Sequence, residues 1–516
     1  MNRTHFEMRG SSTTALGGLF RRSTHLLRLD AMSNVNGTLR RSVLINMVGR
    51  YSNIVIQLIV TAVLARVLSP KEFGLMAVVG VIAVFLSFLS EMGLGPAVVQ
   101  FDELLSKQLA GLFWLTVVVG GCAGLALSLS GPLISNFYGD GIYSSIANGI
   151  AVNVAFSCWA IVPLALLRRR KRFHTIARIE VVAAAFSGIC AVWSALHGGG
   201  VGALVLKGTS NAFFIFLFSV VLAKPPFCEP TLLRMGHVFS YSGYQFLFNF
   251  FNYFTRNADK LLIGKYLGSI PLGLYDMSYR LMLMPISNLT HVITPAIQPV
   301  YAEYAKNPVI IFESYQKLVR ILAIGGGFVG AMCLGCAPEI ILLSYGKQWA
   351  AAVPVFSIFS LSITVQVILS STGSVFQALG KTKLLFVTGV FSTVTTVSAI
   401  VVGIFIGDLR VLASMVVASF FINFIQGFYV LTKFGFERAT YDLFFPSMRT
   451  LVGVAVMSII AIGLREQFPP ISSEVLVRFI GKAGVIGGLY FVMICISGDA
   501  TFIRGAVALR SRRLAK

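Results

Sequence analysis

The chain has 516 residues, of which 56% are hydrophobic and only 12% are charged, and its mean hydropathy is +0.81. Soluble globular domains carry about 25% charged residues, so this composition excludes a soluble protein and predicts one that crosses a membrane many times. The net charge of +22 does not indicate nucleic-acid binding, because Lys and Arg gather at the ends of the apolar runs, where they orient membrane helices.

Residues 1–41 are polar and basic and are expected to form a cytoplasmic tail. The long apolar runs that follow lack the alternating pattern of barrel strands, so we predict an all-α polytopic membrane protein with about 14 transmembrane helices. The expected spans are 43–65, 74–90, 108–130, 144–167, 176–196, 201–223, 238–262, 272–300, 321–344, 350–379, 383–407, 411–433, 446–464 and 475–497. The short loops between them leave no room for a soluble catalytic domain.

Basic residues set the expected orientation. The run Arg168-Arg169-Arg170-Lys171-Arg172 directly follows the fourth span, and the linker 224–237 and the tail 499–516 lie on the same side as this run. Since Lys and Arg are concentrated in cytoplasmic loops, both termini are predicted to be cytoplasmic.

An internal repeat indicates a duplicated architecture. Leu68 to Gly74 and Leu267 to Gly273 both read L-x5-G, followed by Leu, at an offset of 199 residues, and each follows a long apolar run. We therefore expect an N-lobe at 42–223 (helices 1–6), a C-lobe at 238–435 (helices 7–12) and two extra helices at 436–498 (helices 13–14). Parallel repeats around a central site are a common transporter architecture. Only Arg478 and Lys482 are charged in the last span, so these two charges are expected to be dispensable for transport.

Charged residues inside the apolar runs are the candidate site. They are Arg50, Lys207, Arg256, Asp259, Lys260, Asp276 and Arg280. Each such charge costs roughly 2.5–3.5 kcal/mol at mid-bilayer and usually faces a bundle interior or a wet cavity. Arg256 with Lys260 and Asp276 with Arg280 have the i,i+4 spacing of one helix face. We expect Asp276 to neutralise Arg280, and Asp259 to neutralise Arg256 or Lys260, which leaves a cationic cavity suited to an anionic substrate. The alternative is that Arg50, Lys207 and the 256–260 group lie at the membrane surface.

No pattern predicts an enzyme or a metal site. The six histidines are scattered, no metalloprotease or nucleophile motif occurs, and Cys333-x-x-Cys336 lies in an apolar run without a partner pair. We expect the seven cysteines to be packing residues, and no metal or cofactor, although a coupling ion, H⁺ or Na⁺, stays open.

Several motifs together resemble the polysaccharide transporter family, the Wzx-type flippases of the superfamily that also contains multidrug antiporters and lipid II flippases. They are residues 43–74, the run 166–173 (LLRRRKRF), residues 258–268 (ADKLLIGKYLG), Gly273-Leu274-Tyr275, Tyr279-Arg280-Leu281 and Gly346-Lys347-Gln348-Trp349. The resemblance covers about residues 43–435. Within this family, the sequence is similar to exporters of colanic acid or succinoglycan units. It implies a V-shaped pair of six-helix lobes, as in the MATE-type antiporters, plus two C-terminal helices.

The same resemblance implies a flippase in the bacterial inner membrane. Its substrate would be an undecaprenyl-pyrophosphate-linked oligosaccharide for exopolysaccharide or lipopolysaccharide synthesis, moved by alternating access. The cationic residues would hold the pyrophosphate. Aromatic and amide side chains of the seventh span would contact the sugars: Tyr244, Gln245, Asn249, Asn252 and Tyr253. Expected partners are the lipid-linked substrate, membrane lipid, a polysaccharide polymerase and a chain-length regulator, and no nucleic acid.

Two other functions compete with this one. A drug or cation antiporter of the same superfamily needs an acidic cavity, whereas the surplus charge here is positive. A membrane polysaccharide polymerase or ligase usually has a large outward catalytic loop, which this chain lacks.

Overall fold

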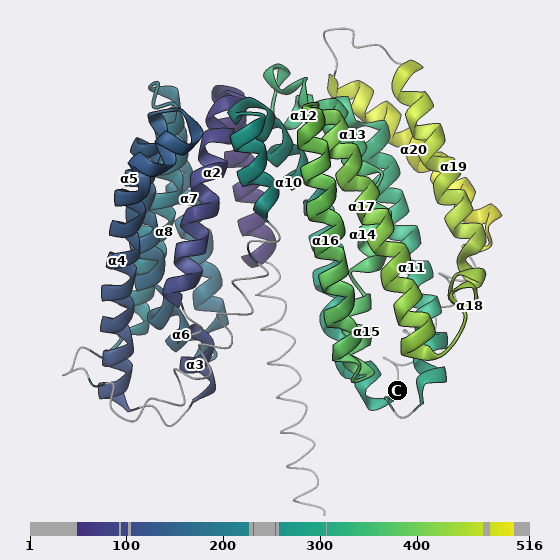
Figure 1. Cartoon of the computed structure of the whole chain (residues 1–516), viewed down its shortest axis with the longest axis horizontal. Helices are drawn as coiled ribbons and strands as arrows, with labels where there is room; N and C mark the ends of the chain where they lie inside the picture. Colours follow the sequence, from purple (N-terminus) through teal and green to yellow (C-terminus); the bar gives the residue numbers. More distant parts are fainter. Residues whose placement is uncertain are drawn as a thin grey trace, which may run out of the picture.

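The computed structural model describes residues 49–91, 94–101, 105–226, 231, 253, 257–305, 307–467 and 475–499. All regular elements in these ranges are helices, which confirms the all-α prediction (Figure 1). The first half contains a helix at Gly49–Val67, then α2 (Pro70–Glu91), α3 (Leu94–Gln100), α4 (Ser106–Tyr138), α5 (Ile142–Trp159), α6 (Ile161–Arg169), α7 (Phe173–Leu196) and α8 (Val201–Ala223).

The second half begins, within the described ranges, with a helix over 257–266. It continues with α10 (Ser269–Glu303), α11 (Pro308–Gly335), α12 (Ala337–Ser344), η1 (Lys347–Trp349), α13 (Ala352–Ser360), α14 (Ile363–Leu369), α15 (Thr372–Ala378), α16 (Thr382–Ile406), α17 (Leu409–Val430), η2 (Leu431–Phe436), α18 (Thr440–Phe444), η3 (Phe445–Ser447), α19 (Met448–Gln467) and α20 (Val475–Ile496).

The predicted number of fourteen spans is not confirmed. Eleven helices of the described residues are long and apolar enough to cross a membrane, or twelve if the bent pair Ala352–Ser360 and Ile363–Ala378 forms one span. The seventh predicted span, 238–262, lies mostly outside the described residues. The eighth, 272–300, is a single helix, α10, that carries Asp276 and Arg280.

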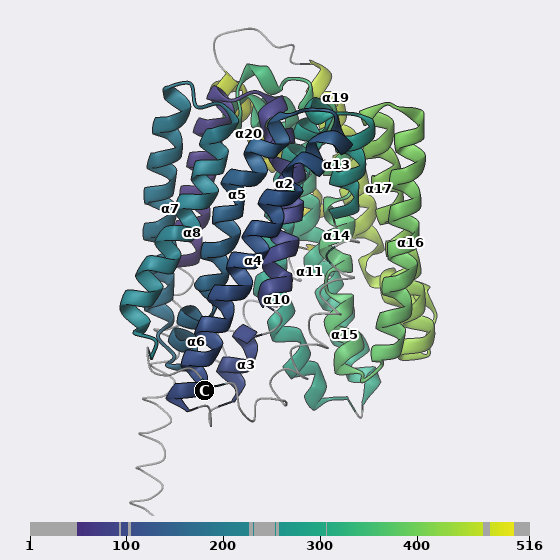
Figure 2. The ribbon, with the colours of Figure 1, turned by 60° about the vertical axis from the view of Figure 1, so that its left-hand side comes forward.

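The helices form two bundles that lie against each other at one end of the molecule and apart at the other, where α6 and α15 are found (Figure 1). One bundle holds α2 to α8, and the other holds α10 to α17, with α19 and α20 on its outer side (Figures 1 and 2). Among the labelled helices, α2 and α10 make the most extensive contact between the bundles. This arrangement matches the expected V of two lobes with two added helices.

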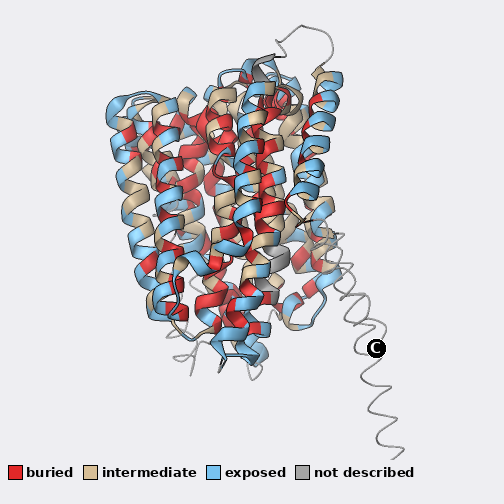
Figure 3. Cartoon of the chain, turned by 90° about the vertical axis from the view of Figure 1, so that its right-hand side faces the viewer, coloured by how far each residue is buried: buried red, intermediate tan, exposed pale blue. Residues whose placement is uncertain are grey.

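The outer helix faces are apolar. Phe405 and Ile496 are 87% and 80% exposed, and exposed positions alternate with buried ones along the helices (Figure 3). Large apolar side chains exposed on every outer helix would be unstable in water, so these faces contact lipid. The chain is a multi-pass membrane protein.

Three predicted spans contain breaks. The span 144–167 divides into α5 and α6 at Ala160, and 321–344 divides into α11 and α12 at Cys336, just before Pro338. The span 350–379 divides into α13, α14 and α15, where the hydroxyls of Ser362, Ser370 and Ser371 donate to carbonyls three residues earlier. Such bonds compete with the helical pattern and accompany bends.

Two buried ion pairs attach the last two helices to the second bundle. Lys482 Nζ of α20 lies 2.9 Å from Glu339 Oε1 of α12, and both side chains are almost fully buried. Near the end of α20, the buried Asp499 pairs with Arg320 of α11 and accepts hydrogen bonds from Thr450 of α19 at 2.8 and 3.0 Å. Lys482 therefore has a packing role that the sequence did not indicate, because a buried carboxylate depends on it. That its charge is dispensable for transport stays a prediction.

The ion pair predicts a specific stability pattern. Lys482→Met should lower the thermal stability of the purified protein, because losing one partner of a buried pair costs about 3–5 kcal/mol. Adding Glu339→Gln should restore much of the loss, because the second change removes the unpaired charge. A double variant that melts no higher than Lys482→Met would contradict this account of the pair.

The orientation has a direct test in the turns that flank α7. Arg172 and His197 are both exposed and lie at opposite ends of this 24-residue helix, which is about 36 Å long. In a chain without native cysteines, Arg172→Cys should be shielded from an impermeant thiol reagent added to intact cells, and His197→Cys should react. The reverse pattern would place the termini outside.

Candidate functional site

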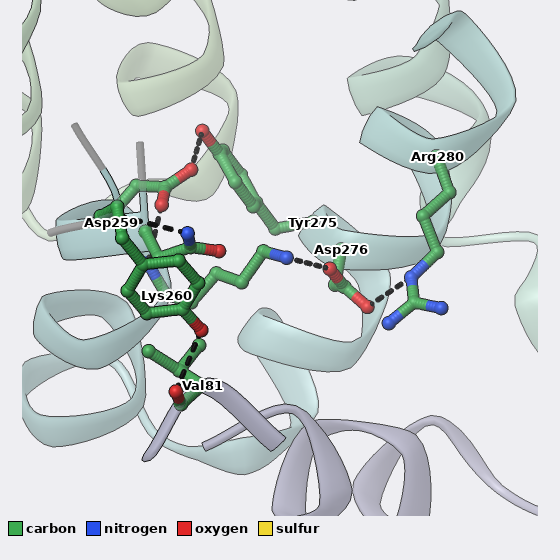
Figure 4. Close-up of polar contacts among 8 residues, drawn as sticks. Val81, Asp259, Lys260, Tyr275, Asp276 and Arg280 are labelled. Atoms are coloured by element: carbon green, nitrogen blue, oxygen red, sulfur yellow. Dashed lines mark hydrogen bonds and ion pairs between the residues drawn. The ribbon is translucent and has the colours of Figure 1, made fainter. Parts of the chain in front are cut away.

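The candidate site centres on Asp276 of α10, a carboxylate that is 2% exposed and bridges two cations (Figure 4). Arg280 Nε lies 2.7 Å from Oδ2, one helical turn along α10. Lys260 Nζ, from the helix over 257–266, lies 3.0 Å from Oδ1 but is not aligned with it as a hydrogen bond. The predicted Asp276–Arg280 pair is present, and Lys260 joins it.

A third cation, from the other bundle, lies within electrostatic range of this group. Lys207 of α8 lies close enough to Arg280 for their charges to interact, and its Nζ donates to Thr61 Oγ1 of the first helix at 3.1 Å. The side chain of Arg280 is 62% exposed. The guanidinium of Arg280 is therefore accessible, as expected for a polar site.

Asp259 is buried and accepts two hydrogen bonds from described residues. Its Oδ1 accepts from the backbone N–H of Lys260 at 2.8 Å, and its Oδ2 accepts from the Tyr275 hydroxyl at 3.1 Å (Figure 4). The ion pair that the structure gives Lys260 is with Asp276. The structure therefore pairs Lys260 with Asp276 and leaves Asp259 as a hydrogen-bonded carboxylate beside this ion-pair triad. The other partner expected for Asp259, Arg256, lies outside the described residues.

Arg50 is not brought to this group. It is exposed, and its nearest charged neighbours include Glu180 of α7, which also interacts with Arg168 of the basic run. Arg50 precedes Thr61 by eleven residues of the same helix, which corresponds to about 16 Å. It therefore belongs to the basic end of the first bundle.

The sugar-contact predictions fall mostly outside the described residues: Tyr244, Gln245, Asn249 and Asn252 lie there, as does Arg256. Tyr253 is described. Its hydroxyl donates to the carbonyl of Val81 in α2 at 2.6 Å, and its ring lies 5.4 Å from Phe88 and 6.3 Å from Phe85. In this conformation Tyr253 joins the two bundles.

The arrangement has more positive than negative charge. Lys207, Lys260 and Arg280 face Asp259 and Asp276, and Asp276 is shared by two of the cations. Unshared donors remain on Arg280 because Asp276 engages only its Nε. A guanidinium has five N–H donors in a fixed fork that matches carboxylate or phosphate oxygens, so this group can bind an anion.

Sequence reasoning missed three neighbours of the charged group. Thr61 accepts a hydrogen bond from Lys207, Tyr275 donates one to Asp259, and Tyr345 lies within electrostatic range of Arg280. Tyr275 and Tyr279 stack with ring centroids 5.9 Å apart, and both contact Phe359. Tyr275 could have been found from its spacing, because it precedes Asp276 and lies i,i+4 from Tyr279.

The cysteines offer no metal site in the part of the chain that the structure describes. Cys333 and Cys336 are both free, and no group of three or more potential ligands occurs there.

One relative matches most of the chain. The chain is 22% identical over 475 residues to the succinoglycan biosynthesis transport protein ExoT of Rhizobium meliloti (strain 1021), and the match covers 89% of this chain and 93% of that protein.

Two solved structures share the fold. The lipid II flippase MurJ in an inward closed conformation matches 90% of this chain and 100% of its own with a TM-score of 0.66 at 12% identity. An inward-facing MATE family transporter of the MOP superfamily matches 79% of this chain and 96% of its own with a TM-score of 0.56 at 12% identity. The expected MATE-like fold is confirmed.

The family itself is given by a match over residues 63–354, more than half of the chain, to the model described as polysaccharide biosynthesis protein. This range contains α2 to α8, the helix over 257–266, α10 and the Gly346–Trp349 motif, and hence the Lys207, Lys260, Asp276 and Arg280 group. The chain is therefore a member of the polysaccharide biosynthesis protein family, as the sequence motifs indicate.

Proposed function

We propose that this protein is a flippase that moves undecaprenyl-pyrophosphate-linked oligosaccharide units across the bacterial inner membrane. The observation that carries the proposal is the cationic group between the two bundles, Lys207 from one and Lys260 with Arg280 from the other. A transporter of a lipid-linked sugar pyrophosphate needs positive charge at the polar path and no catalytic site. Family membership and the transport role in the name of ExoT support the same substrate class.

The charges favour an anionic substrate. Taking a pyrophosphate from water into a membrane protein requires charge-assisted hydrogen bonds to replace its hydration. Arg280 retains free donors after pairing with Asp276, and Lys207 of the opposite lobe lies within electrostatic range of it. A substrate that binds both residues would contact both lobes, so its presence would change the relative stability of inward-open and outward-open states.

The alternatives fit less well. A cation antiporter would need carboxylates free to bind its substrate, but Asp259 and Asp276 are buried and engaged by Tyr275, Lys260 and Arg280. A polymerase or ligase would need a catalytic loop outside the membrane. The protein is expected to bind no cofactor, and the coupling ion would be H⁺ or Na⁺. Both termini would be cytoplasmic, and a polymerase and a chain-length regulator would act on the exported units.

Removal of the Lys207 charge tests this proposal. Lys207→Gln should impair export in a deletion strain while the protein still inserts, because losing a buried charge does not hinder insertion. A charge-assisted hydrogen bond contributes about 1.5–3 kcal/mol, so substrate binding should weaken roughly 10- to 150-fold. The measurement is the amount of radiolabelled lipid-linked repeat unit on each side of the membrane, with membrane abundance of each variant.

Lys433→Gln is the matched control, because Lys433 is exposed at the end of the second bundle and its Nζ contacts Tyr429. This control should export normally.

Normal export by an abundant double variant, Lys207→Gln with Arg280→Gln, would rule out the cationic group as the substrate site. Unpolymerised units on the outer face of the deletion strain would instead indicate a polymerase.

A further inference from the structure

The repeated L-x5-G turns contain the strongest unexplained feature of the molecule. With the offset of 199 residues, Pro70 is equivalent to Ser269 and Gly74 to Gly273. The structure begins α2 at Pro70 and α10 at Ser269, so the repeat extends to the start of the second helix in each hairpin. The second helices of the two hairpins therefore begin at equivalent positions.

These turns contact each other across the interface between the lobes. A Cβ atom added to Gly74 would lie 1.8 Å from Ser269 O, and one added to Gly273 would lie 2.0 Å from Pro70 O. Gly74 thus packs on the carbonyl of Ser269, and Gly273 packs on the carbonyl of Pro70, which is the residue equivalent to Ser269 in the first lobe. A contact of this reciprocal kind is what a two-fold relation between equivalent elements produces. Only glycine leaves room for a backbone approach this close.

Equivalent cations flank the glycines on both sides. Arg66 Nη2 donates to the carbonyl of Leu343, at the end of α12, at 2.6 Å. Its counterpart in the repeat is Lys265, whose Nζ donates to the carbonyl of Phe137, at the end of α4. Each cation therefore reaches from the first helix of its own lobe to a helix end of the other lobe.

The family motif at Gly346–Trp349 adds a further contact at this end. Trp349 Nε1 donates to Ala65 O at 2.7 Å, and Gln348 Nε2 donates to Leu68 O at 2.8 Å. Ala65 lies in the last turn of the helix at Gly49–Val67, where helix carbonyls lack intrahelical partners, and Leu68 follows directly. The motif thus caps that helix end from the other lobe.

We infer that these contacts form a gate that closes the outward side of the transporter and separates when the protein opens outward. The gate consists of Gly74, Gly273, Arg66, Lys265 and the pair Gln348 and Trp349. It lies at the end where the two bundles meet, opposite α6 with its basic run (Figures 1 and 2). The lobes bind each other there through main-chain carbonyls, so opening exchanges these hydrogen bonds for bonds to water at modest cost.

This inference rests on the proposed transport function and adds the element that controls outward access. Its test needs no substrate. In a chain without native cysteines, Leu283→Cys is the reporter, because Leu283 is 37% exposed and lies one helical turn from Arg280 on the same face of α10. The rate of its reaction with an impermeant maleimide, added to the outer face of the membrane, reports whether the gate is open.

Valine at Gly74 or Gly273 should prevent closure and raise the rate of labelling several-fold. Gly80→Val is the matched control in α2, because a Cβ at Gly80 meets nothing within 4 Å, and it should leave the rate unchanged. The double variant Arg66→Gln with Lys265→Gln removes both cations without adding bulk, and it should also raise the rate.

The inference is overturned if the abundant double variant and both valine variants label no faster than the parent chain, or if Gly80→Val raises labelling as much as they do. If the valine variants are too scarce to measure, the inference is also overturned when the double variant labels no faster than the parent chain. Faster labelling in membranes that lack the oligosaccharide would support the gate even if the Lys207 variant exported normally, so the two proposals can fail independently.

Discussion

A single buried carboxylate, Asp276, holds the polar centre of this protein together. It binds Lys260 from one helix and Arg280 from the next, and without it two positive charges would lie unpaired in an apolar bundle. Charges of one sign in close proximity repel strongly where water is scarce. Asp276 therefore allows three cations, with Lys207 from the opposite lobe, to occupy one small region. It does so without neutralising the group, because the three cations outnumber the carboxylates of Asp259 and Asp276.

Two kinds of contact divide the remaining work. Main-chain carbonyls and glycines join the lobes at one end, whereas side-chain ion pairs inside the second bundle hold α19 and α20 in place. Buried ion pairs are costly to break, but contacts between exposed cations and carbonyls are not. A molecule built in this way can separate its lobes at the joined end while each lobe remains rigid. That is the mechanical requirement for alternating access around the Lys207 and Arg280 group.

Several features were predictable from residue spacing alone. Asp276 and Arg280 are four residues apart on a helix, and this spacing gave the correct ion pair. The L-x5-G repeat predicted duplicated lobes, and the structure adds that α2 and α10 start at equivalent positions. The ion pair was predictable because it depends on local helix geometry, which sequence spacing determines directly.

Features that depend on tertiary packing were not predictable. Asp259 and Lys260 are adjacent, so their side chains point about 100° apart around the helix, and Lys260 found its partner in another helix. The span 350–379 has the sequence of one apolar run. The hydrogen bonds from its serine hydroxyls to backbone carbonyls, which accompany its bends, could not be predicted from that sequence. Arg66 and Lys265 looked like ordinary charges at helix ends. Their reciprocal role becomes visible only when the repeat and the structure are combined.

Reconstituted transport is the most direct test of the central claim that this protein moves a lipid-linked oligosaccharide across a membrane. Purified protein would be placed in vesicles with an undecaprenyl-pyrophosphate-linked oligosaccharide in the inner leaflet, and an added glycosidase would detect sugar that reaches the outer leaflet. The account predicts protein-dependent appearance of intact lipid-linked sugar outside, and its loss with the combined Lys207→Gln and Arg280→Gln variant. No transfer by the active parent protein, or transfer that the combined variant leaves unchanged, would contradict the account.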